Sequence, residues 1–170
     1  MECIMSQNIR IFGDVAVIEM RRGFYAVIDE EDIPIVAQHR WSMSGSGYAT
    51  AYVGGGRKGA KFALLHRFVI DARPGQKIDH RNRVKLDCRK ANLREATDAQ
   101  NAANKASRTN IYKGIFQCAI TGKWRARIRS NGKIQNLGHH ATKELAAEAY
   151  NRAAIALNGD FAYINQIEGS

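Results

Sequence analysis

An acidic residue and a histidine stand side by side near the middle of this chain, at Asp79-His80. Asn92 follows 12 residues after the histidine, and Asn101 follows 21 residues after it. The surrounding pattern predicts a short strand that ends at His80 and a second one just after Asn92. A capping box over Thr97–Gln100 then places Asn101 early on a helix. These polar residues can act together only if two short strands and a helix bring them to one place.

Such a set suits hydrolysis of a phosphodiester bond with the help of one divalent cation. Carboxylate and amide oxygens bind hard cations, so we expect Asp79 and Asn101 to hold Mg²⁺ or Mn²⁺. A neutral imidazole takes a proton from water near pH 7, which makes His80 the expected general base. Asn92 is expected to fix the following loop by hydrogen bonds. An isolated Asp-His pair, in contrast, is more often an ordinary turn pair among surface amides.

One geometric condition applies to this pair. Neighbouring side chains on a regular strand point to opposite faces of the sheet. Asp79 and His80 can therefore serve one site only where their strand ends and turns into the basic loop that follows.

The charge balance favours a polyanionic partner. The 170 residues include 26 Lys and Arg against 16 Asp and Glu, a net charge of +10. Nucleic acid is the commonest such partner, although a basic surface can also serve solubility. The three cysteines show no CxxC spacing, which argues against a disulfide framework or a zinc knuckle and favours a reducing compartment.

No apolar run approaches the roughly 20 residues needed to span a bilayer. The N-terminus also lacks the basic-then-apolar order of a secretion signal. We therefore expect an intracellular protein, in a bacterial or phage-infected host cytoplasm, without a membrane segment. No protein partner is implied, and the chain would act as a monomer or a homodimer.

The order of strand-like and helix-like segments along the chain predicts an α+β fold with four successive zones. Residues 1–71 form a β-rich N-terminal region, 72–106 contain the two short strands and the helix, 107–110 are a linker, and 111–165 form a C-terminal module. In the first zone we expect a three-strand meander, then a short helix that contains Pro34, and then a hairpin. The expected ranges are 9–12, 15–20 and 24–28 for the meander, 29–38 for the helix, and 47–53 and 60–66 for the hairpin.

The C-terminal module reads as a three-stranded antiparallel sheet packed on one helix. We expect strands at 112–120, 123–130 and 133–137 and a helix over 142–158 that stops at Gly159. The helix carries a small apolar stripe suited to close packing, namely Ala146, Ala149, Tyr150, Ala153 and Leu157.

The middle strand of this module separates its residues by character. Trp124, Ala126 and Ile128 alternate with three arginines, Arg125, Arg127 and Arg129. Guanidinium groups on one sheet face can fork onto guanine edges or clamp phosphates. Because surface strands usually mix charge signs, this uniform face favours DNA binding over a merely solvated surface.

Five segments together resemble the His-Asn-His endonuclease family, in particular its phage and intron-encoded homing branch. They are Leu65-His66-Arg67, Ile78-Asp79-His80, Leu86-Asp87-Cys88-Arg89, Asn92-Leu93-Arg94 and Asn101. The resemblance implies a ββα-metal site with Asp79 and Asn101 as metal ligands, His80 as general base and Asn92 as the loop-fixing residue. It also implies products with a 5′-phosphate and a 3′-hydroxyl.

Basic residues around these segments are expected to contact DNA: His66, Arg67, Arg81, Arg83, Arg89 and Arg94. The first two match a recurrent upstream pair with a structural or phosphate-contacting role. Cys88 departs from the family, where an Asn is usual, and Glu95 stands where an apolar residue is typical. A packed bystander thiol is the expected state of Cys88.

The C-terminal module resembles the DNA-binding domain of plant Apetala and ethylene-response factors over about 55 residues. The shared segments are Tyr112-Lys113-Gly114-Ile115, Lys123-Trp124-Arg125-Ala126, Leu137-Gly138, Ala146–Asn151, Ala153-Ala154 and Gly159–Asn165. The resemblance implies a sheet laid in the major groove, with Lys113, Arg125, Arg127 and Arg129 on DNA and Gln117 and Asn136 as candidate readers. Ile134 and Asn136 replace an Arg and a Trp of the plant members, so the sequence preference should differ.

The sequence therefore predicts a metal-dependent, site-directed DNA endonuclease of the homing type, acting on double-stranded DNA. The alternative is a non-catalytic, sequence-selective DNA-binding regulator, which needs the arginine face but no metal. An RNA-binding protein is the third interpretation. It is disfavoured because few aromatic residues fall into an exposed stacking set.

Overall fold

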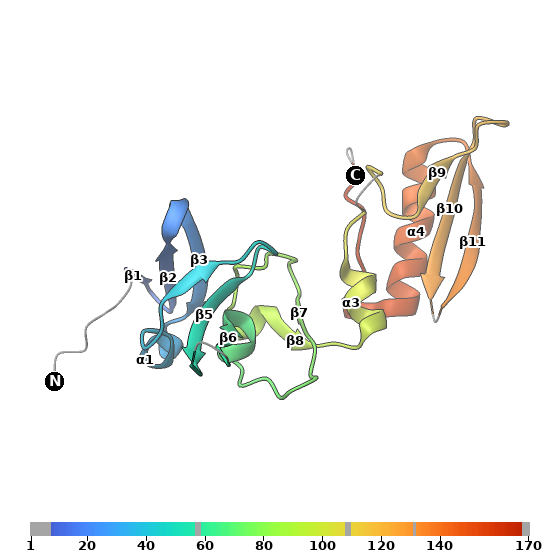
Figure 1. Ribbon diagram of the computed structural model, residues 1–170. Coiled ribbons are helices and arrows are strands. Elements are labelled where there is room, and N and C mark those ends of the chain that lie inside the picture. The colour runs from blue at the N-terminus through green and yellow to red at the C-terminus, as the bar shows by residue number, and fades with distance from the viewer. Residues whose placement is uncertain (1–7, 57–58, 108–109, 131, 168–170) are drawn as a thin grey trace. The chain divides into compact units, whose positions relative to one another are not determined.

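The computed structural model describes residues 8–56, 59–107, 110–130 and 132–167 (Figure 1). The chain forms two compact units, Met1–Glu95 and Ala96–Ser170, and each is described by itself. The fold is α+β, as predicted, with several small antiparallel sheets and a C-terminal helix packed on a sheet.

The first unit begins with the predicted meander of β1 (Ile9–Phe12), β2 (Val15–Met20) and β3 (Phe24–Asp29), paired antiparallel in that order. Every second residue of β2 is buried, as expected for a strand with one face on the core. A 3₁₀ turn (Arg21–Gly23) joins β2 to β3. A second one (Glu30–Asp32) leads into α1 (Ile33–Val36), which has Pro34 in its first turn.

A second sheet follows, in the order β4 (Trp41–Met43), β5 (Ala49–Gly54) and β6 (Lys61–Leu64). β4 was not predicted, because its three residues bury only Trp41 and show no alternation. The predicted last strand is also too long by two residues, since Leu65 and His66 open α2 (Leu65–Phe68). A strand would expose one of these two neighbours, whereas a helical turn buries both.

The predicted pair of short strands is present as β7 (Ile78–His80) and β8 (Leu93–Glu95), which are antiparallel. The loop between them ends in a 3₁₀ turn (Lys90–Asn92) and is attached to β3. The Val27 N–H donates to Leu86 O at 2.8 Å, and the Cys88 N–H donates to Val27 O at 2.7 Å. Cys88 is fully buried there, as a packed thiol.

One hydrophobic core runs through the whole first unit, from Ala16 in β2 to Leu93 in β8. The predicted boundary between residues 71 and 72 therefore separates segments that contribute to the same hydrophobic core. The division between compact units falls at Glu95 and Ala96, so β7 and β8 lie in the first unit and the following helix lies in the second. The predicted division into functional domains is a separate question from this packing, and it remains a prediction.

The second unit starts with α3 (Asp98–Asn104), where Thr97 and Gln100 form the predicted capping box. The C-terminal module then forms as predicted, a three-stranded antiparallel sheet with one helix along its face (Figure 1). Its elements are β9 (Ile115–Gln117), β10 (Trp124–Ser130), β11 (Lys133–His140), α4 (Lys143–Asn158) and a closing 3₁₀ turn (Gly159–Phe161). Thr142 caps α4 by accepting from the Leu145 N–H at 3.2 Å.

Two strands of this module differ clearly from their predicted lengths, and a glycine with positive φ lies beside one and within the other. β9 is shorter than 112–120, because Gly114 turns the chain at φ +77° just before it. A Cβ there would lie 2.4 Å from Arg127 O and 2.5 Å from the Tyr150 ring, so only glycine fits. β11 runs three residues beyond 133–137, through an irregular register that includes Gly138 at φ +102°.

The helix stripe is partly different from the prediction. Ala146 and Tyr150 are buried, but Leu157 is 40% exposed, and Ala147 and Ala154 take its place in the core. The prediction misplaced the buried face of α4, because alanines occur on more than one side of this helix and do not mark by themselves the side that packs on the sheet. In the part of the chain that the structure describes, no helix has the length and apolar character to cross a bilayer.

Candidate active site and nucleic-acid surface

The imidazole of His80 lies buried at the end of β7 against two other rings. Its centroid is 4.9 Å from that of His66 and 6.0 Å from that of Tyr48, and the latter two are 5.0 Å apart. His80 is the last residue of its strand, and the Arg83 N–H donates to its carbonyl at 2.9 Å to close the turn. The histidine therefore stands where the sequence argument required it.

Burial sets the protonation of both imidazoles. It lowers the pKa of His80, although the carboxylates of Asp79 and Asp87 and a hydrogen bond with the Lys85 backbone act in the opposite direction. Burial, aided by the positive charges of His80 and Arg67, lowers the pKa of His66 to about 4. Both rings are therefore neutral near pH 7, and His80 can accept a proton there.

Arg94 of the facing strand holds the carboxylate of Asp79. The two residues are paired in register, and Asp79 Oδ2 accepts from Arg94 Nε at 3.0 Å and from Nη2 at 2.8 Å. The side chains are 8% and 7% exposed for Arg94 and Asp79. Arg94, predicted to contact DNA, thus makes a buried ion pair instead, because its position opposite Asp79 directs it inward.

The side chain of Asn92 spans the loop between the two strands. Its Oδ1 accepts from the Asn82 N–H at 3.0 Å, and its Nδ2 donates to Asp87 O at 2.8 Å. Its own carbonyl accepts from the Arg81 N–H at 2.9 Å. These bonds are those of a residue that fixes the loop beside His80.

The structure adds two residues to this cluster that no motif indicated. Tyr48 comes from the segment just before β5, far upstream of His80. The Nζ of Lys85 lies 4.7 Å from the centre of the Tyr48 ring and donates to Ser46 O at 2.8 Å. Tyr48 showed only as the start of a predicted strand, since a ring contact across the fold leaves no local signal.

The upstream pair His66-Arg67 has an internal arrangement. His66 is 5% exposed, and its buried Nδ1 has no hydrogen-bond partner within the described residues. The guanidinium of Arg67 donates to the carbonyls of Gln76 and Arg73, the latter at 2.7 Å. Both residues were predicted to contact DNA. Their burial and internal bonds instead favour the structural role that the resemblance also allowed.

The loop arginines divide into two kinds. Arg89 makes a two-pronged contact with Asp87, with Nε at 2.8 Å from Oδ1 and Nη2 at 2.7 Å from Oδ2. This hydrogen bonding lowers the pKa of Asp87. Arg81 and Arg83 are exposed. The exposed pair is better placed than Arg89 for a DNA contact.

Asn101 lies early on α3 in the second unit, where its N–H donates to Thr97 O at 2.9 Å. Because the two units are described separately, its meeting with Asp79 stays a prediction. Within the described residues, no three or more His, Cys, Asp or Glu side chains come together as a metal site. The predicted pair of one carboxylate and one amide is a smaller donor set than that.

Lys113, another predicted DNA contact, is engaged within the second unit. Its Nζ donates to the carbonyls of Ala102, Ala103 and Lys105 at the end of α3, at 3.2, 2.6 and 2.6 Å. An ammonium group has three protons to donate, and these bonds use all three. Lys113 thus caps a helix C-terminus, which weighs against its use on DNA.

The arginines of β10 lie on the sheet face away from α4. Ala126 and Ile128 are buried toward the helix, whereas Arg125 and Arg129 are exposed. The guanidinium carbon of Arg127 lies 4.1 Å from the centre of the Phe116 ring, a cation–π contact between neighbouring strands of the sheet. Asn136 is exposed on β11 opposite Arg127, and Gln117 donates to Gly122 O at 3.1 Å.

Comparison with known proteins finds one family model and several relatives that match this chain. The family model described as HNH endonuclease matches residues 65–103. An uncharacterized HNH endonuclease of Acanthamoeba polyphaga mimivirus is 32% identical over 153 residues, which cover 86% of this chain and 78% of the viral protein. The chain therefore belongs to the HNH endonuclease family.

Plant proteins are similar to part of the chain. APETALA2-like protein 2 of Oryza sativa is 42% identical over 59 residues, and an AP2-like ethylene-responsive transcription factor of Arabidopsis thaliana is 38% identical over 63 residues. These segments cover 35% and 37% of this chain but only 14% and 13% of the plant proteins. No solved structure matches the chain.

Proposed function

We propose that this HNH endonuclease is a metal-dependent, site-directed enzyme of the homing type that cuts double-stranded DNA with His80 as general base. The supporting observation is the state of His80. It is the last residue of β7, hydrogen-bonded to the Lys85 backbone, flanked by Asp79 and kept neutral at pH 7 by burial. A base in this state takes a proton from water as the water oxygen bonds to phosphorus and the bond to the 3′ oxygen breaks.

The donor chemistry of the predicted ligands suits Mg²⁺ or Mn²⁺, because a carboxylate and an amide supply only oxygens. Asp79 and Asn101 would hold the ion, which would stabilise the charge that develops on the phosphate and the leaving oxygen. Arg94 keeps the carboxylate of Asp79 in a fixed position at the edge of the His80 cluster. Asn92 keeps the adjoining loop in place through both ends of its amide.

The C-terminal module would supply DNA binding through Arg125, Arg127 and Arg129. Support comes from the exposure of this face, from the stacking of Arg127 on Phe116, and from the similarity to plant transcription factors. An arginine that already contacts an aromatic ring loses less side-chain entropy when it forks onto a base or a phosphate. Arg81 and Arg83 would add contacts near the cutting site.

One observation favours the alternative of a non-catalytic DNA-binding regulator. Asp79 is already paired with Arg94, and a carboxylate engaged by a guanidinium is less available to a cation. In that function the arginine face binds DNA, and nothing is cut.

Nicking of supercoiled plasmid in the presence of Mg²⁺ or Mn²⁺ separates the two functions. We expect wild-type protein to nick the plasmid and His80→Ala to bind it with near wild-type affinity without nicking. His39→Ala is the matched control, because His39 lies in the same unit but packs on Trp41 and Phe68. Tight, salt-sensitive binding by the wild type without any cleavage would establish the regulator instead.

A further inference from the structure

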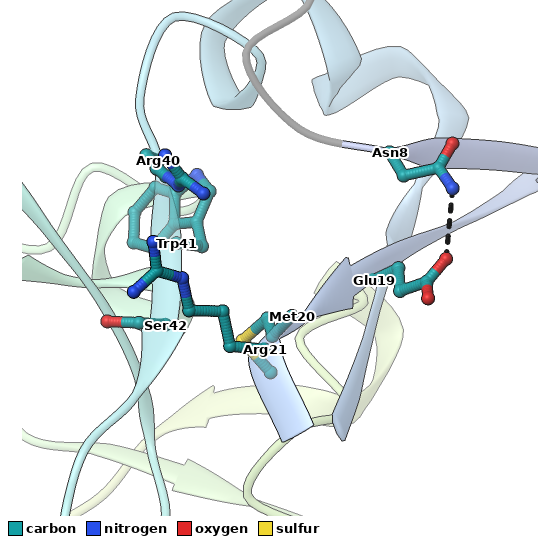
Figure 2. Close-up of a pocket in the computed structure, with 7 residues that line it drawn as sticks. All are labelled: Asn8, Glu19, Met20, Arg21, Arg40, Trp41 and Ser42. Atoms are coloured by element: carbon teal, nitrogen blue, oxygen red, sulfur yellow. Dashed lines mark hydrogen bonds between the residues drawn. The ribbon is translucent and has the colours of Figure 1, made fainter. Parts of the chain in front are cut away.

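A pocket in the first unit, separate from the His80 cluster, has a strongly basic wall. It measures about 560 Å³ and lies where the end of β2 meets β4 (Figure 2). Seven residues line it: Asn8, Glu19, Met20, Arg21, Arg40, Trp41 and Ser42.

The floor of this pocket is rigid. Trp41 is 2% exposed, and its Nε1 donates to Val36 O at 2.9 Å, so the indole cannot rotate without breaking a buried hydrogen bond. Met20 is 3% exposed. A fixed apolar floor of this kind keeps the shape of the pocket constant beneath the polar groups that line it.

The acid of the pocket is already engaged. Glu19 Oε2 accepts from Asn8 Nδ2 at 3.0 Å and from Arg10 Nη2 at 3.3 Å. Figure 2 shows Glu19 and Asn8 on the wall opposite Trp41, with the guanidinium groups of Arg21 and Arg40 on the Trp41 side. Glu19 therefore does not neutralise the two arginines across the pocket.

Arg21 and Arg40 have no counter-charge of their own. Within the residues that the structure describes, neither guanidinium takes part in a hydrogen bond or an ion pair. They come from separate elements, Arg21 from the turn after β2 and Arg40 from the residue before β4. Two like charges that converge on one pocket without an acid between them form a site for an anion.

We propose that Arg21 and Arg40 bind a phosphate of the DNA backbone, which gives the first unit its own contact with the duplex besides the catalytic cluster. The inference rests on the proposed function for its ligand. A DNA phosphate fits best because guanidinium forks match phosphate oxygens and because the pocket has room for a sugar-phosphate unit. The contact positions the duplex and reads no sequence, since it touches only the backbone.

The salt dependence of DNA binding tests this site. Each phosphate contact contributes about 0.9 to the slope of log Kobs against log salt on duplex DNA. For the Arg21→Asn, Arg40→Asn double variant, which loses this one phosphate contact, we expect the slope to fall by roughly one compared with the wild type, with a weaker Kd on a generic duplex.

Arg22 offers a matched control. It is adjacent to Arg21, exposed, and does not line the pocket; its φ of +67° is one that Asn tolerates. We expect Arg22→Asn to change the slope much less than Arg21→Asn. Equal effects at the two positions would show a general loss of charge and overturn the proposal. An unchanged slope in the double variant, with an unchanged melting temperature, would overturn it as well.

Two further arms keep this proposal separate from the proposed function. Inorganic phosphate and single-stranded RNA are titrated against wild type and double variant; a preference for either over duplex DNA at these arginines contradicts the proposal. If the wild type cuts plasmid but the double variant binds like the wild type, only the pocket assignment fails. If the wild type neither cuts nor binds DNA, the proposed function itself fails.

Discussion

Acidification should destabilise the first unit through His66. The pKa of His66 falls from 6.5 to about 4 because the ring is buried in the folded state. Between these two values the unfolded chain binds a proton that the folded chain excludes, so the free energy of unfolding falls as the pH falls through this window. Above pH 6.5 His66 contributes no pH dependence.

The size of the effect follows from the shift. One pKa unit corresponds to about 1.4 kcal/mol, so His66 alone should remove about 3 kcal/mol of stability by the lower end of the window. The pKa of His80 is lowered too, which adds a loss of the same sign. Asp87, whose pKa is lowered from 3.8, is stabilising at higher pH, and this contribution disappears only at still lower pH. The histidine effect is therefore separable from that of the acids.

Urea unfolding across this pH window measures the loss. The fluorescence of Trp41 reports on the first unit in a Trp124→Phe background, because these are the two tryptophans of the chain. His66→Phe keeps a ring of similar size but cannot be protonated, so its stability should depend less steeply on pH than that of the Trp124→Phe parent. A parent whose stability is flat between pH 6.5 and about 4, or a His66→Phe variant with the same slope as the parent, would refute the reasoning.

Three further perturbations test the packing. Gly114→Ala should destabilise the second unit by roughly 2–4 kcal/mol in thermal unfolding, because of its positive φ and its clash with Tyr150; Gly122→Ala, with nothing near its Cβ, should cost only about 1 kcal/mol. Alkylation followed by mass spectrometry should label Cys118, whose pKa is lowered by its hydrogen bond with Thr121, and spare Cys88, whose pKa burial raises to about 12. Thr97→Ala should cost about 1 kcal/mol through the lost cap of α3, and an unchanged melting curve would contradict the capping geometry.

Local patterns in the sequence were enough to predict most of the elements. The meander, the capping box of α3 and the extent of α4 follow from alternation, cap residues and a terminal glycine, which are all short-range signals. β4 and α2 were missed or misassigned for the same reason. A three-residue strand and a single helical turn are set by what they pack against, and their own residues carry too short a pattern.

The candidate site shows the same limit. The order of Asp79, His80 and Asn92 in the sequence indicated a short strand that contains Asp79 and ends at His80, and the position of Asn92 just before the next strand. The partners that determine their environment, His66 and Tyr48 around the imidazole and Arg94 on the carboxylate, depend on strand register and on ring contacts between distant segments. A basic side chain also has the same appearance in sequence whether or not it has partners inside the fold, so the sequence could not reveal the internal bonds of Arg94 and Lys113.

The most direct test of the central claim is a Mn²⁺ titration of the isotopically labelled protein followed by NMR. Paramagnetic broadening should reach the backbone amide signals around Asp79 and around Asn101 at the same Mn²⁺ concentration, since one ion is expected to lie between them. In Asp79→Asn, which preserves an acceptor for Arg94, the broadening at Asn101 should disappear together with that at position 79. Broadening at Asn101 that persists in this variant, or that never accompanies broadening at Asp79, would contradict a shared metal site and with it the proposed mechanism.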